Sequence, residues 1–357
     1  MDKNAIMNRR ESPIKVIGKG LLKFFTLLLA ILFVIVAALY AVMWVLIKGP
    51  SPTAQRLFIM SARETSAMKW LPNMYLSEPE IISIIGVSEP DMEVMYEMDT
   101  SLITLPPVRR VLLDNDDVDE ADQDIDEIFD DGDGLELFDI VGSGYRGYML
   151  VVDDPSRLFV GTPTHFGSVG VRLVDMVERT GAVAGVNAGG FYDPDGVGMG
   201  GIPDGIVICD GEIKWGADNG YVNVIGFDAD GLLHVGYMTP NAALNLGLQW
   251  AVSFGPTLIS NGVAPDRELL RSGINPRTAI GQRADGAVLL LVIDGRQIDS
   301  LGATFEDMVE IFLEFGAVNA ANLDGGSSTL MVFEGELINN CASVAGPRPI
   351  PTAFLVR

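Results

Sequence analysis

An uninterrupted apolar run near the N-terminus divides the chain into parts of different kinds. Between Phe24 and Ile47 no side chain is charged, and the run has no polar face. It is long enough to cross a bilayer, which takes about 20 apolar residues, whereas the apolar region of a signal peptide is usually shorter. A core helix is disfavoured because it would keep a polar face. We therefore expect a transmembrane anchor, with signal-peptide cleavage as the alternative at Ala37, Ala38 or Ala41.

Flanking charge sets the expected orientation of this anchor. Basic residues are dense before the run and sparser after it: Lys3, Arg9, Arg10, Lys15, Lys19 and Lys23 precede it, and Lys48, Arg56 and Arg63 follow. Positive charge is retained on the cytoplasmic side of a membrane. We therefore predict a single-pass protein of the cell membrane, with a cytoplasmic N-terminus and an extracytoplasmic folded part.

Net charge narrows the range of partners. The chain carries a formal charge of −24, and residues 1–50 hold seven basic and two acidic side chains, so residues 51–357 carry −29. Nucleic-acid binding needs a basic stripe that neutralises phosphates, and such an acidic ectodomain is repelled by anionic surfaces. We expect no nucleic-acid partner, and contact with the membrane only through the N-terminal helix.

The scarcity of cysteine and histidine excludes several kinds of site. The chain has two cysteines, Cys209 and Cys341, and two histidines, His165 and His234. A disulfide framework, a cysteine-rich zinc site and a multi-histidine metal site are therefore ruled out. Pairing of the two cysteines is left open. We expect no cofactor and assign no metal ligand, although the acidic composition leaves a bound divalent cation open.

Composition divides the rest of the chain. Asp114 to Asp139 holds fourteen acidic residues and no basic one. A calcium loop is the alternative to a solvated linker, but Glu127 stands where an EF-hand loop requires glycine after Asp122-x-Asp124-x-Asp126. The expected organisation is a cytoplasmic tail at 1–23, an anchor at 24–47, a stalk or spacer at 48–113, an acidic linker at 114–134 and a catalytic domain at 135–357.

Short apolar runs separated by turn residues predict strands from about Leu135 onward. Tyr148–Val152 is one such run, and Ala287–Ile293 is entirely apolar, which indicates a central strand buried on both faces. Ile206–Cys209 and Glu212–Trp215 flank the dipeptide Asp-Gly, which predicts a hairpin with a type I′ turn.

Two amphipathic helices are predicted, at Ser168–Arg179 and Phe305–Phe315, the second with Thr304 as its N-cap. The sequence after each helix is nearly the same, at Gly181–Gly190 and Gly316–Gly326: a glycine stop, a short strand, a polar residue and paired glycines. This suggests two equivalent helix–strand units, each ending in a tight loop where functional sites tend to form.

Polar residues cluster beside glycines in four places. These are Asn187 to Gly205, Asn275–Gly281, Asp294–Arg296 and Asn322–Ser328. Taken singly, each is an ordinary turn or loop. Together they supply two carboxylates, two guanidiniums and glycine-rich loops that can hold an anion, a set that fits a sugar bonded to a phosphate.

Other catalytic templates fit worse. The glycines from Gly196 to Gly201 have the wrong spacing for a dinucleotide-binding loop. No Gly-x-Ser-x-Gly elbow and no Walker A lysine are present. Ser327 or Ser328 as nucleophile would need a base, and nothing in the sequence places a histidine near either.

These motifs, in this order, resemble the phosphodiester glycosidase family over roughly Leu135 to Arg357. The matching segments are Tyr145–Leu150, Val186–Phe191, Phe254–Pro256, Asn275–Gly281, Asp294–Arg296, Asn322–Ser328 and Arg348. The resemblance implies an α+β fold, a mixed sheet with packed helices, and hydrolysis of a sugar-1-phosphodiester with release of the sugar. One departure is that Ser327 directly follows Gly326, where the family often has a third glycine.

The resemblance and the glycine-flanked motifs together suggest roles for individual residues. Asp294 and Asp324 are expected to be the working carboxylates, and Arg277 and Arg296 to hold the phosphodiester. The expected substrate-binding residues are Asn187, Gly189, Gly190, Asp193, Asp204, Gly325, Gly326, Ser327, Ser328 and Arg348. The substrate is expected to be a GlcNAc-1-phosphodiester-like glycan or a sugar-phosphate polymer of the cell envelope. The alternative is a non-catalytic protein that binds glycans or assists the assembly of exopolysaccharide or cell-wall polymer.

Overall fold

The computed structural model describes residues 13–86, 96–105, 127–130, 134–216, 220–343 and 345–357. The chain divides into two compact units, Met1–Gln55 and Arg56–Arg357. The larger unit therefore includes part of the stretch expected as a spacer. Most of the expected acidic linker, with its calcium-loop alternative, lies outside the described residues.

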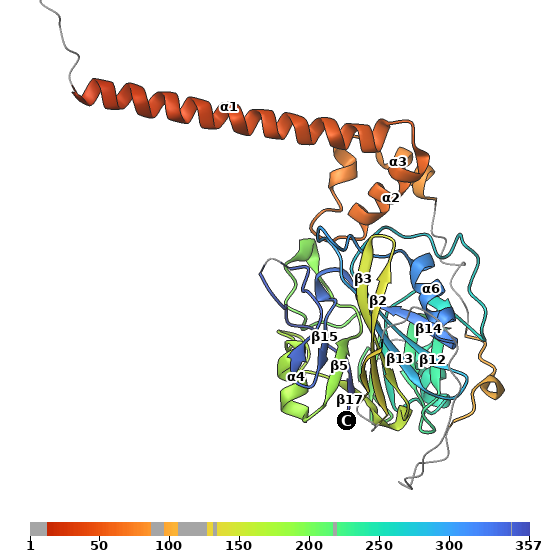
Figure 1. The fold of residues 1–357 in the computed structure, drawn as a ribbon. Coiled ribbons are helices and arrows are strands. Elements are labelled where there is room, and N and C mark those ends of the chain that lie inside the picture. Colours follow the sequence, from red (N-terminus) through yellow and green to blue (C-terminus); the bar gives the residue numbers. More distant parts are fainter. Residues whose placement is uncertain (1–12, 87–95, 106–126, 131–133, 217–219, 344) are drawn as a thin grey trace, which may run out of the picture. The chain divides into compact units, whose positions relative to one another are not determined.

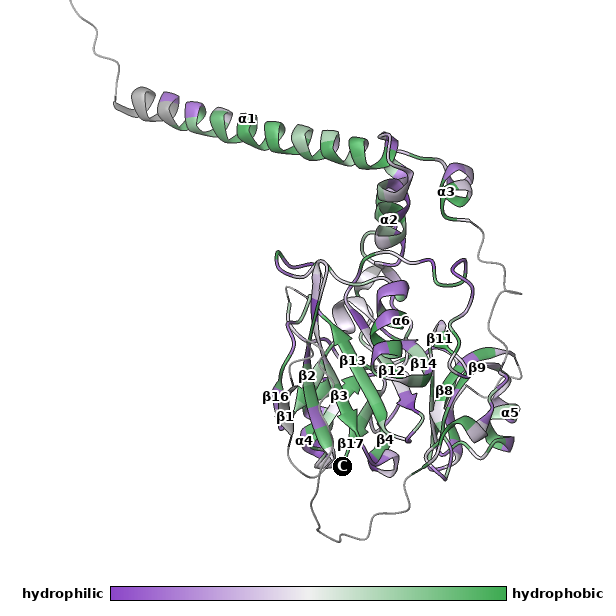
Figure 2. Cartoon of the chain, turned by 45° about the vertical axis from the view of Figure 1, so that its right-hand side comes forward, coloured by the Kyte–Doolittle hydropathy of each residue, from purple (hydrophilic) through white to green (hydrophobic). Residues whose placement is uncertain are grey.

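The first unit is built around one long helix, α1 (Pro13–Lys48). Within it, Leu21–Lys48 is long and apolar enough to cross a membrane, and a signal sequence would meet the same criterion. Figure 2 shows hydrophobic residues along most of its described length. The predicted apolar N-terminal helix is confirmed, and its role as an anchor stays a prediction.

The second unit contains all the described strands, which form three antiparallel sheets. The seven-stranded sheet has the order β1 (Glu127–Asp130), β2 (Leu135–Gly142), β3 (Tyr145–Val152), β13 (Val288–Ile293), β12 (Arg277–Arg283), β14 (Ala317–Leu323) and β11 (Thr257–Ile259). One five-stranded sheet has the order β7 (Glu212–Trp215), β6 (Val207–Cys209), β10 (Trp250–Ser253), β8 (Val222–Phe227) and β9 (Leu233–Met238). The other has the order β16 (Glu336–Leu337), β15 (Met331–Phe333), β5 (Ala184–Asn187), β17 (Ala353–Val356) and β4 (Leu158–Gly161).

Short helices connect or cover these strands. They are α2 (Pro52–Arg63), which crosses the boundary between the units, α3 (Glu78–Ile85), α4 (Leu173–Thr180), α5 (Pro240–Asn245) and α6 (Phe305–Glu314), with 3-10 turns at Leu71–Met74, Thr100–Leu102, Pro155–Arg157, Pro194–Gly196 and Gly326–Ser328. The predicted combination of helices and sheet is confirmed. The prediction of a mixed sheet, with parallel as well as antiparallel strands, is wrong, because every strand pairing in the described residues is antiparallel.

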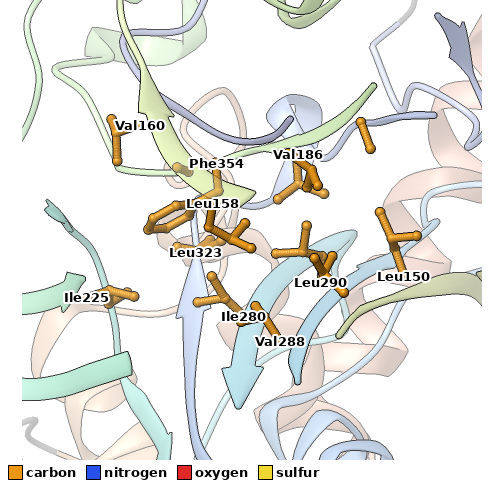
Figure 3. Close-up of a cluster of buried hydrophobic side chains, with 14 of the residues drawn as sticks. Leu150, Leu158, Val160, Val186, Ile225, Ile280, Val288, Leu290, Leu323 and Phe354 are labelled. Atoms are coloured by element: carbon orange, nitrogen blue, oxygen red, sulfur yellow. The ribbon is translucent and has the colours of Figure 1, made fainter. Parts of the chain in front are cut away.

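Strand β13 lies in the middle of the seven-stranded sheet, between β3 and β12, as its apolar sequence predicts (Figure 1). Its alternate side chains enter two different cores. Val288, Leu290 and Val292 belong to a cluster that also takes side chains from both five-stranded sheets. Figure 3 shows Leu290 of this cluster with Phe354 of the third sheet. The side chains of the opposite face pack with those of α6. Both faces are therefore buried.

Local signals in the sequence account for several element ends. The hairpin of β6 and β7 turns through Asp210 and Gly211, both with positive φ, as a type I′ turn requires. Thr304 caps α6, with its hydroxyl accepting from the Asp307 N–H in a capping box. Gly181 ends α4 in the left-handed conformation. The two cysteines are unpaired.

Candidate active site

The two nearly repeated segments of the sequence meet in space. Strand β5 ends at Asn187 and strand β14 ends at Leu323, and the N–H of the next residue, Asp324, donates to the carbonyl of Ala188 at 2.8 Å. The Asn187 amide also donates to the Asp324 carbonyl. The ends of two different sheets are therefore joined at the position where the sequence places its polar, glycine-rich loops.

A pocket of about 570 Å³ opens beside this junction. It contains ten of the residues predicted from the sequence: Asp193, Asp204, Arg277, Arg296, Asp324, Gly325, Gly326, Ser327, Ser328 and Arg348. Phe191, Phe254 and Phe305 supply apolar surface to the same pocket. A pocket that combines carboxylates, guanidiniums and aromatic rings is suited to a polar ligand that carries negative charge.

Asp324 is the carboxyl group in the pocket whose protonation is most altered. Burial raises its pKa to about 7, while the Ser328 hydroxyl, the Arg348 charge and the Gly325 N–H act in the opposite direction. The neighbouring charge of Asp193 adds to the increase. A carboxyl group that is half ionised near neutral pH can both accept and donate a proton, which an ordinary aspartate cannot do at that pH.

Arg348 keeps the Asp193 carboxylate ionised. The guanidinium donates to both carboxylate oxygens at 2.9 Å and also to the Gly198 carbonyl at 2.7 Å. Burial would raise the pKa of Asp193, but Arg348, the Gly198 N–H and the Ser66 hydroxyl together lower it. The pocket therefore holds one carboxylate that stays ionised and one that titrates near pH 7. Asp204, in the same pocket, has its pKa raised by burial.

The two arginines expected to hold a phosphate differ in their surroundings. Arg277 is 5% exposed and donates to the carbonyls of Gly273 and Ala303 and to the Glu64 carboxylate. Its guanidinium also lies 4.3 Å from the centre of the Phe305 ring. Most of its donors are thus already used within the protein.

Arg296 is better placed to meet an incoming anion. One of its guanidinium nitrogens donates to the Thr65 hydroxyl at 2.8 Å and to the Asn275 amide oxygen at 3.1 Å. Among the described residues, no salt bridge joins it to a carboxylate. Its backbone has φ of +60°, a conformation that is strained for a residue other than glycine and often found at functional sites.

Asn322 supplies an acceptor with no partner. Its side chain is 2% exposed, and its amide nitrogen donates to the Gly255 carbonyl at 2.7 Å. Its amide oxygen is buried without a hydrogen-bond partner, although the residue lines the pocket. Since buried acceptors are normally satisfied, this oxygen is an exception beside the pocket and a candidate contact for a ligand.

The structure does not bring every predicted residue into the pocket. The Asp294 carboxylate accepts from the side chain of Asn339 at 3.0 Å and from the backbone of Asn340 at 3.0 Å, and it does not line the pocket. Burial raises its pKa, and these hydrogen bonds oppose the increase. Its contacts fix the loop after β16.

Asn187, Gly189 and Gly190, which were also predicted, are not among the residues that line the pocket. The amide oxygen of Asn187 accepts from the Thr278 hydroxyl at 2.7 Å and from the Leu330 N–H at 3.1 Å. A Cβ at Gly190 would lie 2.6 Å from the Phe254 ring. These residues allow the close packing that supports the pocket wall.

Sequence reasoning missed Glu64, Thr65 and Ser66, which also line the pocket. They follow helix α2, in a stretch that was expected to be a spacer. The available signal was weak: three polar residues at the end of a short amphipathic helix. Their importance follows from contacts with residues more than 100 positions away, which a single sequence does not display.

Comparison with known proteins decides the family. A family model described as phosphodiester glycosidase matches residues 180–357, which include Asp324, Arg296 and Arg348. This chain belongs to the phosphodiester glycosidase family.

Two curated members illustrate the relationship. N-acetylglucosamine-1-phosphodiester alpha-N-acetylglucosaminidase of Mus musculus is 29% identical over 220 residues, which cover 55% of this chain and 41% of that protein. The SPbeta prophage-derived uncharacterized protein YomE of Bacillus subtilis is 32% identical over 191 residues, which cover 50% of this chain and 29% of that protein. The chain thus spans less than half the length of either relative.

The fold of this chain is similar to that of a solved structure. The catalytic domain of zebrafish N-acetylglucosamine-1-phosphodiester alpha-N-acetylglucosaminidase, auto-inhibited by its pro-peptide, matches with a TM-score of 0.50 and 23% identity. The match covers 65% of this chain and 81% of that structure. At this level of identity, the likeness concerns the fold alone.

Proposed function

We propose that this family member is a membrane-anchored, extracytoplasmic glycosidase that hydrolyses a sugar-1-phosphodiester. The observation that carries the proposal is one pocket with two complementary groups: Asp324, whose pKa is raised to about 7, and Arg296, which has no salt bridge to a described carboxylate. The name of the mouse relative supports a GlcNAc-1-phosphodiester-like substrate, either a glycan or a cell-envelope polymer.

Asp324 is assigned the proton transfer. In its ionised form it takes a proton from water as the water oxygen attacks the anomeric carbon. The bond between that carbon and the phosphate oxygen breaks, and the bonding electrons leave with the phosphate. A phosphate leaving group is a weak base, so it needs little help from a general acid. A pKa near the working pH is the value that suits this role.

Charge stabilisation is assigned to the remaining ionised groups. Arg296 binds the phosphodiester and balances the charge that grows on it as the bond breaks. Asp193, kept ionised by Arg348, forms with it an ion pair whose carboxylate lies in the same pocket while positive charge develops on the sugar. Arg277 is assigned a supporting role, because its donors are already bonded within the protein.

Sugar recognition is assigned to Asn322. Its unpartnered amide oxygen accepts a hydrogen bond from a sugar hydroxyl or from the N–H of an N-acetyl group. Asp204 and the ring of Phe254, in the same pocket, offer further polar and apolar contact. Asp294 has no place in the proposed reaction, because its carboxylate is engaged by the loop after β16.

The test is turnover of the methyl phosphodiester of α-GlcNAc 1-phosphate by the full-length protein in detergent. Released GlcNAc is measured by chromatography, with Asp324→Asn as the inactive control. Release by the wild type alone supports the proposal. Binding of the diester without turnover contradicts it and favours the glycan-binding or polymer-assembly alternative. If the protein shows neither binding nor turnover, this sugar is excluded as the substrate.

A further inference from the structure

Three consecutive residues upstream of the family match each act on a different charged residue of the pocket. Glu64 binds Arg277 and Thr65 binds Arg296, and the Ser66 hydroxyl helps to lower the pKa of Asp193, the partner of Arg348. All three belong to the larger compact unit, which begins at Arg56. They lie more than 100 residues before Thr180, where the match to the family model begins.

Glu64 makes the most contacts of the three. One carboxylate oxygen accepts from the Gly273 N–H at 2.7 Å, and the other accepts from the Asn275 side chain at 2.9 Å and from Arg277 at 2.8 Å. Arg277 is a buried cation, and removing the partner of such a cation leaves an uncompensated charge. Glu64 therefore fixes the position of the more deeply buried arginine.

Thr65 orients the arginine that is open to a ligand. Its hydroxyl donates to the Ser61 carbonyl at 2.8 Å, one helical turn back. That bond uses the hydroxyl proton, so the oxygen lone pairs are free to accept from Arg296 at 2.8 Å. The same Arg296 nitrogen donates to Asn275, whose side chain in turn binds Glu64. Glu64 and Thr65 thus hold both arginines in one network.

The segment that carries these residues is packed into the domain. The Ser61 hydroxyl accepts from the Ile274 N–H at 2.8 Å. A Cβ at Gly273 would lie only 2.2 Å from the Ser61 backbone nitrogen, so the two backbones approach more closely than any other residue would permit. Such close backbone packing is typical of a segment that is a fixed part of the domain rather than a loosely attached one.

We propose that Glu64-Thr65-Ser66 is a positioning element that completes the anion-binding site, with Thr65 as the residue that sets the orientation of Arg296. The inference deepens the proposed function and rests on it where it names the anion as a sugar phosphodiester. It also predicts that the functional unit begins near Arg56, well before the segment that matches the family model.

The test uses the full-length protein with Thr65→Val, which removes the hydroxyl at nearly constant volume. Thr180→Val is the matched control, because Thr180 makes the same kind of bond to a carbonyl one turn back, in α4, and does not line the pocket. Binding of α-GlcNAc 1-phosphate is measured by calorimetry, turnover of the methyl diester by chromatography, and folding by thermal denaturation.

The expected result is an affinity about tenfold weaker for Thr65→Val, since a hydrogen bond to a charged group contributes about that factor. Its melting temperature should match that of Thr180→Val, whose affinity stays at the wild-type value. Thr65→Ser should restore binding, because it returns the hydroxyl. If Thr65 had only a structural role, Thr65→Val and Thr180→Val would not differ in affinity while having equal melting temperatures.

With the GlcNAc probes, two results overturn the inference. Wild-type affinity in Thr65→Val would mean that Thr65 does not position Arg296, and tighter binding would mean that the segment occludes the pocket. If the wild-type protein neither binds nor cleaves the GlcNAc probes, the proposed substrate is wrong and inorganic phosphate becomes the probe. A tenfold loss of phosphate affinity in Thr65→Val then sustains the positioning role. Equal affinity, or no phosphate binding by the wild type, rejects it.

Discussion

Asn187 and Asp324 connect two sheets at the candidate active site. Asn187 is the last residue of β5, in one five-stranded sheet, and its amide donates to the carbonyl of Asp324, which directly follows β14 of the seven-stranded sheet. The same amide group accepts from Thr278 and Leu330. One buried side chain therefore sets where the titrating carboxyl group lies relative to both sheets.

This relationship predicts that Asn187→Ala is more damaging to stability than to affinity. The change leaves the Leu330 N–H and the Asp324 carbonyl unsatisfied in a buried place, at a cost of about 3 kcal/mol. Denaturant unfolding followed by tryptophan fluorescence measures the loss. Turnover should also fall, because Asp324 loses its support. A variant as stable as the wild type would contradict the role assigned to Asn187.

Asp324 should control the pH dependence of turnover. A base must be ionised, and the pKa of Asp324 is about 7, so kcat/KM for the methyl diester should rise as pH increases through about 7 and then level off. Asp324→Asn should lower kcat by about 10²-fold or more and remove this ascending limb. A limb that persists in the variant would assign the titration to another group.

The same shift predicts a stability effect of definite sign. Because the pKa of Asp324 is raised above the usual value of an aspartate, its protonated form is favoured by folding. The resulting stabilisation of the folded protein is fully present below pH 4, about the pKa of an aspartate in an unfolded chain, and is lost as the pH rises to about 7. Thermal denaturation should therefore show Asp324→Asn gaining stability relative to the wild type between pH 5 and pH 8. A constant difference across that range would contradict the assignment.

Asp294 and Asp324 look equivalent in the sequence, since each follows an apolar strand and precedes glycine. The structure separates them, because the Asp294 carboxylate is bound by Asn339 and Asn340 while Asp324 enters the pocket. We expect Asp294→Asn to lower the melting temperature, through weaker bonds to the loop after β16, and to leave the pH dependence of kcat unchanged. If Asp294→Asn instead removed the ascending limb, the roles of the two residues would be reversed.

Local chemistry explains why much of the fold could be predicted. The Asp210-Gly211 turn, the Thr304 cap and the apolar run of β13 depend on neighbouring residues, and each is found as predicted. Strand direction and partners depend instead on contacts between distant segments. The sequence therefore did not reveal that all the described sheets are antiparallel, or that β5 and β14 belong to different sheets.

In the candidate site too, features that depend on neighbouring residues could be predicted and those that depend on distant contacts could not. Glycine-flanked motifs indicated Asp324 and Arg296, because close backbone approach and charge leave a local signature, and the family resemblance indicated Arg348. Glu64 and Thr65 have no such signature, since their significance depends on Arg277 and Arg296 lying beside the end of α2. Asn322 belongs to a predicted motif, but only the geometry reveals that its buried oxygen has no partner.

That oxygen yields a prediction about sugar recognition, with a control on the same strand. Asn322→Leu removes the free acceptor, and KM for the methyl diester should rise about tenfold, as expected for one lost hydrogen bond to the sugar. Asn319→Leu makes the same change at another buried residue of β14, which binds the Asn261 N–H and does not line the pocket. Asn319→Leu should lose about 1 to 3 kcal/mol of stability and keep the wild-type KM. Equal KM values in the two variants would mean that Asn322 does not contact the sugar, and a lower KM in Asn322→Leu would mean that its oxygen opposes binding.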